Sequence, residues 1–156
     1  MQLKPALPKP ALCLAIVLCL LALSQPLRAQ APADEKCAGS TVDIQGEKTA
    51  KAARAFLAEL QTAVQANDKD KIAGMVSYPM NFIHHGQRAR IRSKQSFLAR
   101  YDTIFNEHVR KTILGQSAHC LFGNDQGEMI GNGEVWFSEM ADGSIKIITV
   151  NTSAGS

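Results

Sequence analysis

The sequence lacks the short motifs that identify many cofactor-dependent and nucleophilic enzymes. It contains no HExxH zinc motif, no Cys-x-x-Cys pair, no Walker loop, no GxSxG elbow and no GxGxxG turn. Each of these motifs holds a metal, a phosphate, a nucleophile or a dinucleotide in a defined geometry, so the enzyme classes built on them are not indicated. We therefore expect no cofactor.

Residues that could ligate a metal are few and poorly placed. His84 and His85 are adjacent in a predicted strand, where successive side chains point to opposite faces. His119 and Cys120 have the same arrangement, so neither pair can hold one ion without distortion. We expect no metal site.

An excess of one charge sign is missing once the first residues are set aside. The chain has 17 Lys and Arg residues against 14 Asp and Glu residues. Three of the basic residues, Lys4, Lys9 and Arg28, lie in a predicted leader, and the remaining 14 balance the 14 acids. A neutral domain gives no electrostatic indication of nucleic acid as a partner.

The first 31 residues have the layout of a cleaved signal peptide. Lys4 and Lys9 precede an unbroken apolar run over residues 11–23, and small residues follow at Ala29 and Ala31. We predict cleavage near residue 29 or 31, a periplasmic or secreted protein, and no membrane span after processing. The alternative is a retained anchor, which needs about twenty apolar residues, more than this run supplies.

Two cysteines remain after that cleavage, Cys37 and Cys120, in a compartment that permits oxidation. We predict one disulfide between them, which would tie the N-terminal segment to a late strand. It would close a loop of about eighty residues, worth on the order of 4 kcal/mol through lost entropy of the unfolded chain. The alternative is two unpaired thiols.

Two helices are predicted after a loose polar lead-in over residues 32–46. From Glu47 to Ala66 apolar residues recur at spacings of three and four, which is typical of an amphipathic helix. Asp68 caps a second, short helix, which Tyr78-Pro79 ends because a residue before proline avoids the helical region. The apolar stripe of the first helix consists of Ala53, Phe56, Leu57, Leu60 and Val64.

A hairpin is predicted next, with strands over residues 80–85 and 88–92 around Gly86-Gln87, a pair that suits a type II′ turn. In that register His84 lies opposite Ala89, and Phe82 lies opposite Ile91. Side chains alternate between the two faces of a strand pair. The buried face then carries Met80, Phe82, His84, Ala89 and Ile91, and the outer face carries Asn81, Ile83, His85, Arg88, Arg90 and Arg92.

Ser93 caps a third helix, predicted to run unbroken to Leu114 and to end at Gly115. Strands follow at 118–122, 128–130, 134–139 and 144–151, and residues 152–156 form a tail. Gly131-Asn132-Gly133 predicts a bulge or kink within one longer strand. The inward stripe of the third helix comprises Phe97, Leu98, Tyr101, Ile104, Phe105, His108, Val109, Thr112 and Ile113.

This order of elements resembles the NTF2-like superfamily, the cystatin-like α+β cone. The stretch from Phe56 to Val76 is similar to the opening of such domains, where an amphipathic helix ends in a small residue and an Asp. Residues 91–105 and 131–137 resemble a subgroup of secreted bacterial proteins. The resemblance covers residues 47–151 and implies three helices on a curved, mostly antiparallel sheet with a conical pocket. It also implies that a second copy of the chain can pair through the outer sheet face.

Three residues are predicted to face that pocket. Tyr101 and His108 are seven residues apart on the inward stripe, and His84 comes from the facing strand. Two imidazoles and a phenol in an apolar cavity are candidates for ligand binding or for acid–base catalysis. The alternative is that each of the three is a core or rim residue.

Two carboxylates are candidates to partner these histidines. Asp102 neighbours the inward stripe and joins the catalytic candidates. Glu134 precedes the single tryptophan, and alternation puts Trp136 on the same side of the strand, so both join the ligand-binding candidates. The alternatives are a solvated helix residue for Asp102 and a strand-end ion pair for Glu134.

Arg88, Arg90 and Arg92 form a basic stripe on the outer face of the hairpin, which is a candidate surface for an anionic partner. The alternative is that these charges prevent edge-to-edge pairing of an exposed strand. No aromatic residues interleave with the stripe, which disfavours single-stranded nucleic acid.

The sequence thus predicts an exported pocket domain that binds a small ligand or an envelope protein without catalysis. The first alternative is an acid–base enzyme (an isomerase, dehydratase or small hydrolase) that uses His84, Tyr101, His108 and Asp102. The second is an envelope or secretion accessory protein that acts through Arg88, Arg90 and Arg92.

Overall fold

Two helices open the part of the chain that the computed structural model describes, residues 46–155. They are α2 (Glu47–Gln65) and α3 (Lys69–Gly74). α2 confirms the helix predicted over Glu47–Ala66, and its predicted apolar stripe is buried. The cap at Asp68 is also confirmed, because its carboxylate accepts a 2.9 Å hydrogen bond from the Lys71 N–H.

The end of α3 differs from the prediction. The helix stops at Gly74, and strand β1 (Val76–His84) begins before Tyr78-Pro79 instead of after it. Pro79 is exposed and lies where the pairing of β1 with β6 is interrupted, between Val76 and Asn81. A residue without an N–H is tolerated at such an irregularity, so Pro79 did not need to end the preceding element.

A six-stranded sheet follows, in the order β2-β1-β6-β5-β4-β3. β1 and β6 are parallel and every other neighbouring pair is antiparallel, so the fold is α+β with a mostly antiparallel sheet. The strands after β1 are β2 (Gln87–Ile91), β3 (Phe122–Asn124), β4 (Gly127–Ile130), β5 (Val135–Glu139) and β6 (Ile145–Asn151).

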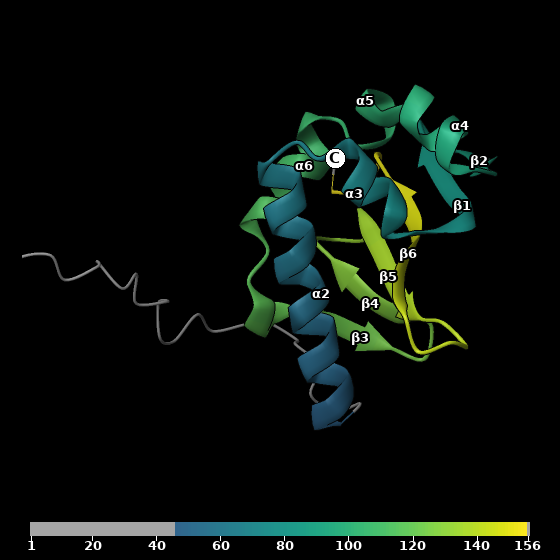
Figure 1. The fold of residues 1–156 in the computed structure, drawn as a ribbon. Coiled ribbons are helices and arrows are strands. Elements are labelled where there is room, and N and C mark those ends of the chain that lie inside the picture. The colour runs from purple at the N-terminus through teal and green to yellow at the C-terminus, as the bar shows by residue number, and fades with distance from the viewer. Residues whose placement is uncertain (1–45, 156) are drawn as a thin grey trace, which may run out of the picture. The chain divides into compact units, whose positions relative to one another are not determined.

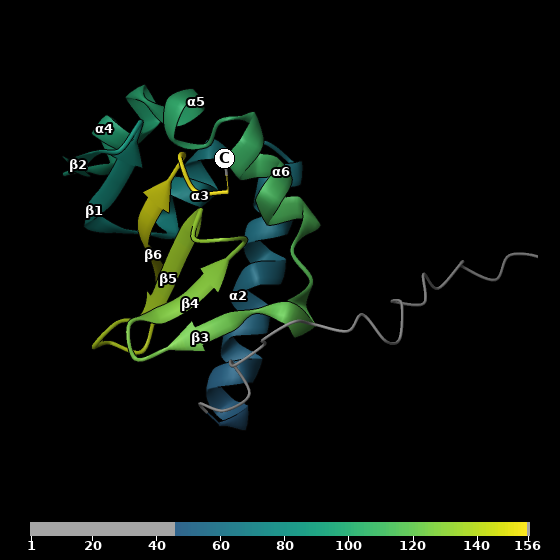
Figure 2. The ribbon, with the colours of Figure 1, turned by 180° about the vertical axis from the view of Figure 1, so that it is seen from behind.

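α2 crosses one face of the sheet (Figure 1). Its Phe56 ring lies 4.7 Å from the ring of Phe137 on β5, and both residues belong to the buried core. The view from behind brings β4, β5 and β6 in front of α2, and no helix within residues 46–155 crosses them there (Figure 2). We call this uncovered side the outer face.

The hairpin between β1 and β2 has a different register from the predicted one. Met80 pairs with Ile91 and Phe82 pairs with Ala89, so the two-residue loop is His85-Gly86. Both loop residues have positive φ, 48° and 73°, as a type I′ turn requires. The shift in pairing is two residues, an even number, so the pairing keeps Phe82 and Ala89 on the same face as predicted. The predicted burial of Ala89 is wrong, because β2 is an edge strand and Ala89 is exposed.

The third predicted helix is broken into three. They are α4 (Lys94–Ala99), α5 (Tyr101–Ile104) and α6 (Glu107–Gly115). Ser93 caps α4 as predicted, accepting a 3.2 Å bond from the Ser96 N–H. The second break comes at Asn106, whose side chain accepts a 2.9 Å bond from the Val109 N–H and caps α6. Asparagine competes for backbone donors and favours caps over helix interiors, which ends one helix and starts another.

Two predictions about the later strands are also wrong. Residues 131–134 form a turn between the antiparallel strands β4 and β5, not a bulge inside one strand. Ala118–Cys120 is a 3-10 turn, η2, and the strand begins only at Phe122. A bulge lies in β6, where Trp136 pairs with Thr149 but Phe137 pairs with Ile147, which leaves Ile148 without an opposite residue on β5.

Candidate functional site

The structure separates the three residues that were predicted to face one pocket. They are Tyr101, His84 and His108, and each contacts a different part of the molecule. Tyr101 is 1% exposed and packs in the core, with its ring 5.5 Å from Phe105 and 5.9 Å from Phe97. Its hydroxyl has no hydrogen-bond partner within residues 46–155, and burial raises the pKa of the phenol. Tyr101 is therefore a core residue in this structure.

His84 holds the C-terminal segment instead of facing Tyr101. The Thr152 hydroxyl donates to the Ile83 carbonyl at 3.2 Å, so it accepts from His84 Nδ1 at 2.8 Å. The Thr152 N–H also donates to the Ile83 carbonyl. The His84 ring stacks on Phe82, with ring centroids 5.7 Å apart. These contacts fix the chain directly after β6 against the end of β1.

His108 and Glu134 are the two sequence candidates that the structure brings together. His108 Nε2 lies 3.1 Å from Glu134 Oε1 and 3.1 Å from the Ala154 carbonyl oxygen. Both of these oxygens accept, so Nε2 carries the proton that the ring donates. Glu134 is 2% exposed, whereas the His108 side chain is 42% exposed. A buried carboxylate thus holds an imidazole that still reaches solvent.

The second oxygen of the Glu134 carboxylate is also occupied. Oε2 accepts from the Asn132 N–H at 2.6 Å, and the Glu134 carbonyl accepts from the Asn151 N–H at 2.8 Å. Gly131 and Gly155 pack so closely against the carboxylate that a Cβ at either position would collide with it. The sequence had predicted that strand alternation places Glu134 beside Trp136. This prediction is wrong, because Glu134 lies in a turn and not in a strand.

Asp102 is a solvated helix residue, the alternative considered from sequence. Its carboxylate accepts a 3.0 Å bond from Lys69 and lies 3.8 Å from Arg110, with a side chain 75% exposed. Neither partner is a histidine, so Asp102 does not complete an acid–base set with His84 or His108.

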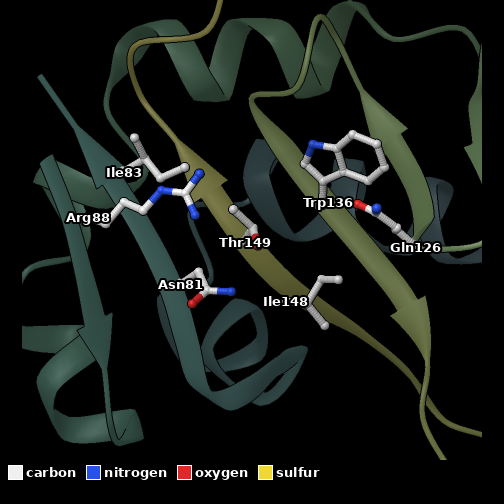
Figure 3. Close-up of a pocket in the computed structure, with 7 residues that line it drawn as sticks. All are labelled: Asn81, Ile83, Arg88, Gln126, Trp136, Ile148 and Thr149. Atoms are coloured by element: carbon white, nitrogen blue, oxygen red, sulfur yellow. The ribbon is translucent and has the colours of Figure 1, made fainter. Parts of the chain in front are cut away.

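A pocket of about 290 Å³ lies on the outer face, and the sequence indicated only part of it (Figure 3). Arg88 reaches from β2 toward Thr149, while Trp136 and Gln126 approach from the other side. The lining combines an indole, two aliphatic side chains, two amides, a hydroxyl and one guanidinium. Its members are Asn81, Ile83, Arg88, Gln126, Trp136, Ile148 and Thr149.

The bulge in β6 builds the floor of this pocket. Ile147 and Val150 are buried in the core, while Ile148 and Thr149, the two residues between them, both line the outer pocket. In a regular strand consecutive residues point to opposite faces, so one of the two would have been directed inward. The extra residue of the bulge adds a second outward side chain.

Arg88 belongs to a broader basic surface. A second hollow of about 440 Å³ adjoins the first and shares Asn81 and Arg88 with it. Arg90 and Arg92 line this second hollow as the alternation of the predicted hairpin indicated, but so does Ala89, which had been predicted on the opposite face. None of the three arginines forms an ion pair within residues 46–155.

No family model, curated protein or solved structure matches this chain. Within residues 46–155, no helix is long and apolar enough to cross a membrane. The same residues contain no cluster of three or more His, Cys, Asp or Glu side chains placed to hold a metal ion. The predicted leader and Cys37 lie outside the described residues, so the cleavage and the disulfide to Cys120 stay predictions.

Proposed function

We propose that this protein is an exported, non-catalytic binding domain whose outer-face pocket holds a small carboxylate with a flat apolar body. The observation that carries the proposal is the pairing of one guanidinium with one indole. Arg88 and Trp136 line the same pocket, and no acidic side chain of the described residues lines it.

The chemistry of the lining selects an anion with an apolar part. Arginine binds a carboxylate through two parallel N–H bonds, and Arg88 has no acid partner within residues 46–155 to compete. Trp136, Ile83 and Ile148 offer apolar surface, and the amides of Asn81 and Gln126 can orient the ligand. The volume of about 290 Å³ is at the small end of ligand pockets, which begin at about 300 Å³.

The same lining argues against catalysis in this pocket. Arg88 is its one ionisable side chain, and a guanidinium stays charged at physiological pH. A general acid or base must exchange a proton near neutral pH, which none of the seven lining residues does.

Benzoate is the probe that tests this proposal, because it joins a carboxylate to a flat apolar ring. Trp136 is the single tryptophan of the chain, so its fluorescence reports on the pocket directly. We expect saturable quenching by benzoate in the wild type and in Arg90→Ala, and its loss in Arg88→Ala. Arg90 is the matched control, since it lies on the same strand but does not line this pocket. Equal quenching in all three proteins would contradict the proposal.

The second candidate function is capture of an acidic envelope protein by the arginine surface. It is favoured by the continuity of the two hollows through Asn81 and Arg88. Charge reversal at Arg90 and Arg92 should then abolish partner capture and leave benzoate quenching intact. If the reversed protein captures the partner as well as the wild type does, this function is wrong.

Membership of the NTF2-like superfamily is part of the proposal. It is supported by the observed order of a helix, a short helix, a strand pair, a helical segment and a strand meander. Export is supported by the leader-like layout of residues 1–31. Mass spectrometry of protein purified from its host, with and without reduction, tests both cleavage near residue 29 or 31 and the Cys37–Cys120 bond.

A further inference from the structure

One nitrogen of the His108 imidazole forms hydrogen bonds within the described residues, and the other forms none. Nε2 donates to Glu134 and to the Ala154 carbonyl, as described above. Nδ1 has no hydrogen bond within residues 46–155. Because the proton sits on Nε2, the neutral ring presents a lone pair at Nδ1, and the buried carboxylate fixes that tautomer.

His108 lines a hollow of about 510 Å³ that lies along one side of α6. Lys111 and Thr112 follow it at helical spacings of three and four, and Ser117 also lines the hollow. Lys111 is exposed and makes no ion pair within the described residues. The hollow therefore presents one ammonium, two hydroxyls and one imidazole lone pair.

The wall of this hollow is held by hydrogen bonds that leave little freedom. The Gln116 amide donates to the Ser117 and Cys120 carbonyls at 3.1 and 3.0 Å, and its oxygen accepts from the Gly131 N–H at 2.8 Å. Gln61 on α2 donates to the Ile113 and Gln116 carbonyls, both at 2.9 Å. A binding site needs such support if its side chains are to be positioned before the ligand arrives.

We propose that this hollow binds a phosphate group, free or on a small molecule, between His108 and Lys111. A ligand for a lone pair must bring a proton or a metal, and the described residues place no group of three or more His, Cys, Asp or Glu side chains to hold a metal ion. At neutral pH inorganic phosphate carries a P–OH that can donate to Nδ1 together with charged oxygens that accept from Lys111, and so does the singly charged form of a phosphate monoester. A carboxylate is fully ionised there and has no proton to donate.

The test is a titration of protein labelled with 15N in its histidine rings, with inorganic phosphate as the probe. We expect a saturable shift of His108 Nδ1, with the other three histidines of the chain unmoved. Lys111→Ala should weaken phosphate binding about tenfold, as expected for loss of one charge-assisted hydrogen bond. Lys51→Ala, an exposed lysine on α2, is the matched control and should bind as the wild type does.

Three results would overturn the proposal. They are no saturable shift at His108, a shift that Lys111→Ala leaves unchanged, and an equal shift produced by acetate. His108→Gln should also abolish binding, but this change disturbs a buried carboxylate, so the exposed Lys111 is the deciding position. A sugar phosphate that binds more tightly than inorganic phosphate would identify a small phosphorylated molecule as the ligand. Equal affinities would identify free phosphate.

Discussion

The outer-face pocket and the His108–Glu134 pair use their polar groups in opposite ways. In the outer pocket Arg88 forms no ion pair within residues 46–155, and Trp136 lines the pocket while its ring also contacts Phe122. At the His108–Glu134 pair both carboxylate oxygens are occupied by donors of the same chain. Groups satisfied internally stabilise the fold, whereas unsatisfied groups at a surface are available for recognition. Variants should therefore separate stability from binding.

The largest expected loss of stability comes from a Cβ beside the buried carboxylate. Gly131 has φ 68°, and an added methyl would collide with Glu134 and with the Thr112 side chain. Gly131→Ala should lower the free energy of unfolding by about 2–4 kcal/mol, combining backbone strain with overpacking. Gly86→Ala is the matched control, because Gly86 has φ 73° but open space around it. There we expect about 1 kcal/mol, from strain alone. Equal losses in urea unfolding would contradict the packing described for Gly131.

The next largest loss of stability is expected when the charge of Glu134 is removed and the shape of its side chain is kept. Glu134→Gln weakens the bonds from His108 and from the Asn132 N–H, and we expect a loss of about 1–2 kcal/mol. Thermal unfolding monitored by circular dichroism measures it. Benzoate quenching at Trp136 should stay unchanged, and a joint loss would mean that the two regions are not separable.

A gain in stability is expected at Glu128, which is 5% exposed on β4. Burial raises the pKa of its carboxyl above the ordinary value of 4.5, and the neighbouring charge of Glu139 raises it further. Glu128 therefore stabilises the fold below the unfolded pKa and loses that contribution as pH rises through the folded pKa. Glu128→Gln should be more stable than the wild type at pH 7, with a difference that shrinks toward pH 4. A difference independent of pH would refute this assignment.

The smallest effect on stability is expected at Arg88, which is exposed. Arg88→Ala should change the free energy of unfolding by less than about 0.5 kcal/mol, as is usual for surface positions. Its effect on benzoate quenching should nevertheless be the largest of the variants discussed. A fall in melting temperature as large as that of Glu134→Gln would place Arg88 among the structural residues.

Local patterns predicted the elements that depend on local physics. The three- and four-residue spacing in α2 gave its limits within one residue, and the caps at Asp68 and Ser93 followed from side chains that accept nearby N–H groups. Glu134 was a sequence candidate to partner a histidine, beside the alternative of a strand-end ion pair, and it contacts His108, 26 residues away. The limits of α2 and the two caps depend on residues near each other in sequence.

The outer pocket could be predicted only in part. Alternation correctly put Asn81, Ile83 and Arg88 on one face, and it did so despite the wrong register. Ile148 and Thr149 were missed, because a bulge is decided by how β5 and β6 pair and leaves no clear signal in Ile-Lys-Ile-Ile-Thr-Val. The contacts of His84 with Thr152 and of His108 with Ala154 were missed for a related reason, since these residues are 68 and 46 positions apart, respectively.

The position of β6 has a consequence for how the chain folds. β6 is the last strand of the described residues, yet it lies in the middle of the sheet, between β1 and β5. Until Ile145–Asn151 has emerged, the β1–β2 hairpin and the β3–β5 meander have no common strand and each exposes an unpaired edge. A sheet closed by such distant pairing folds late and slowly. A protein that crosses a membrane with its N-terminus first would therefore arrive as two unfinished halves, vulnerable to proteases and aggregation until its final strand joins them.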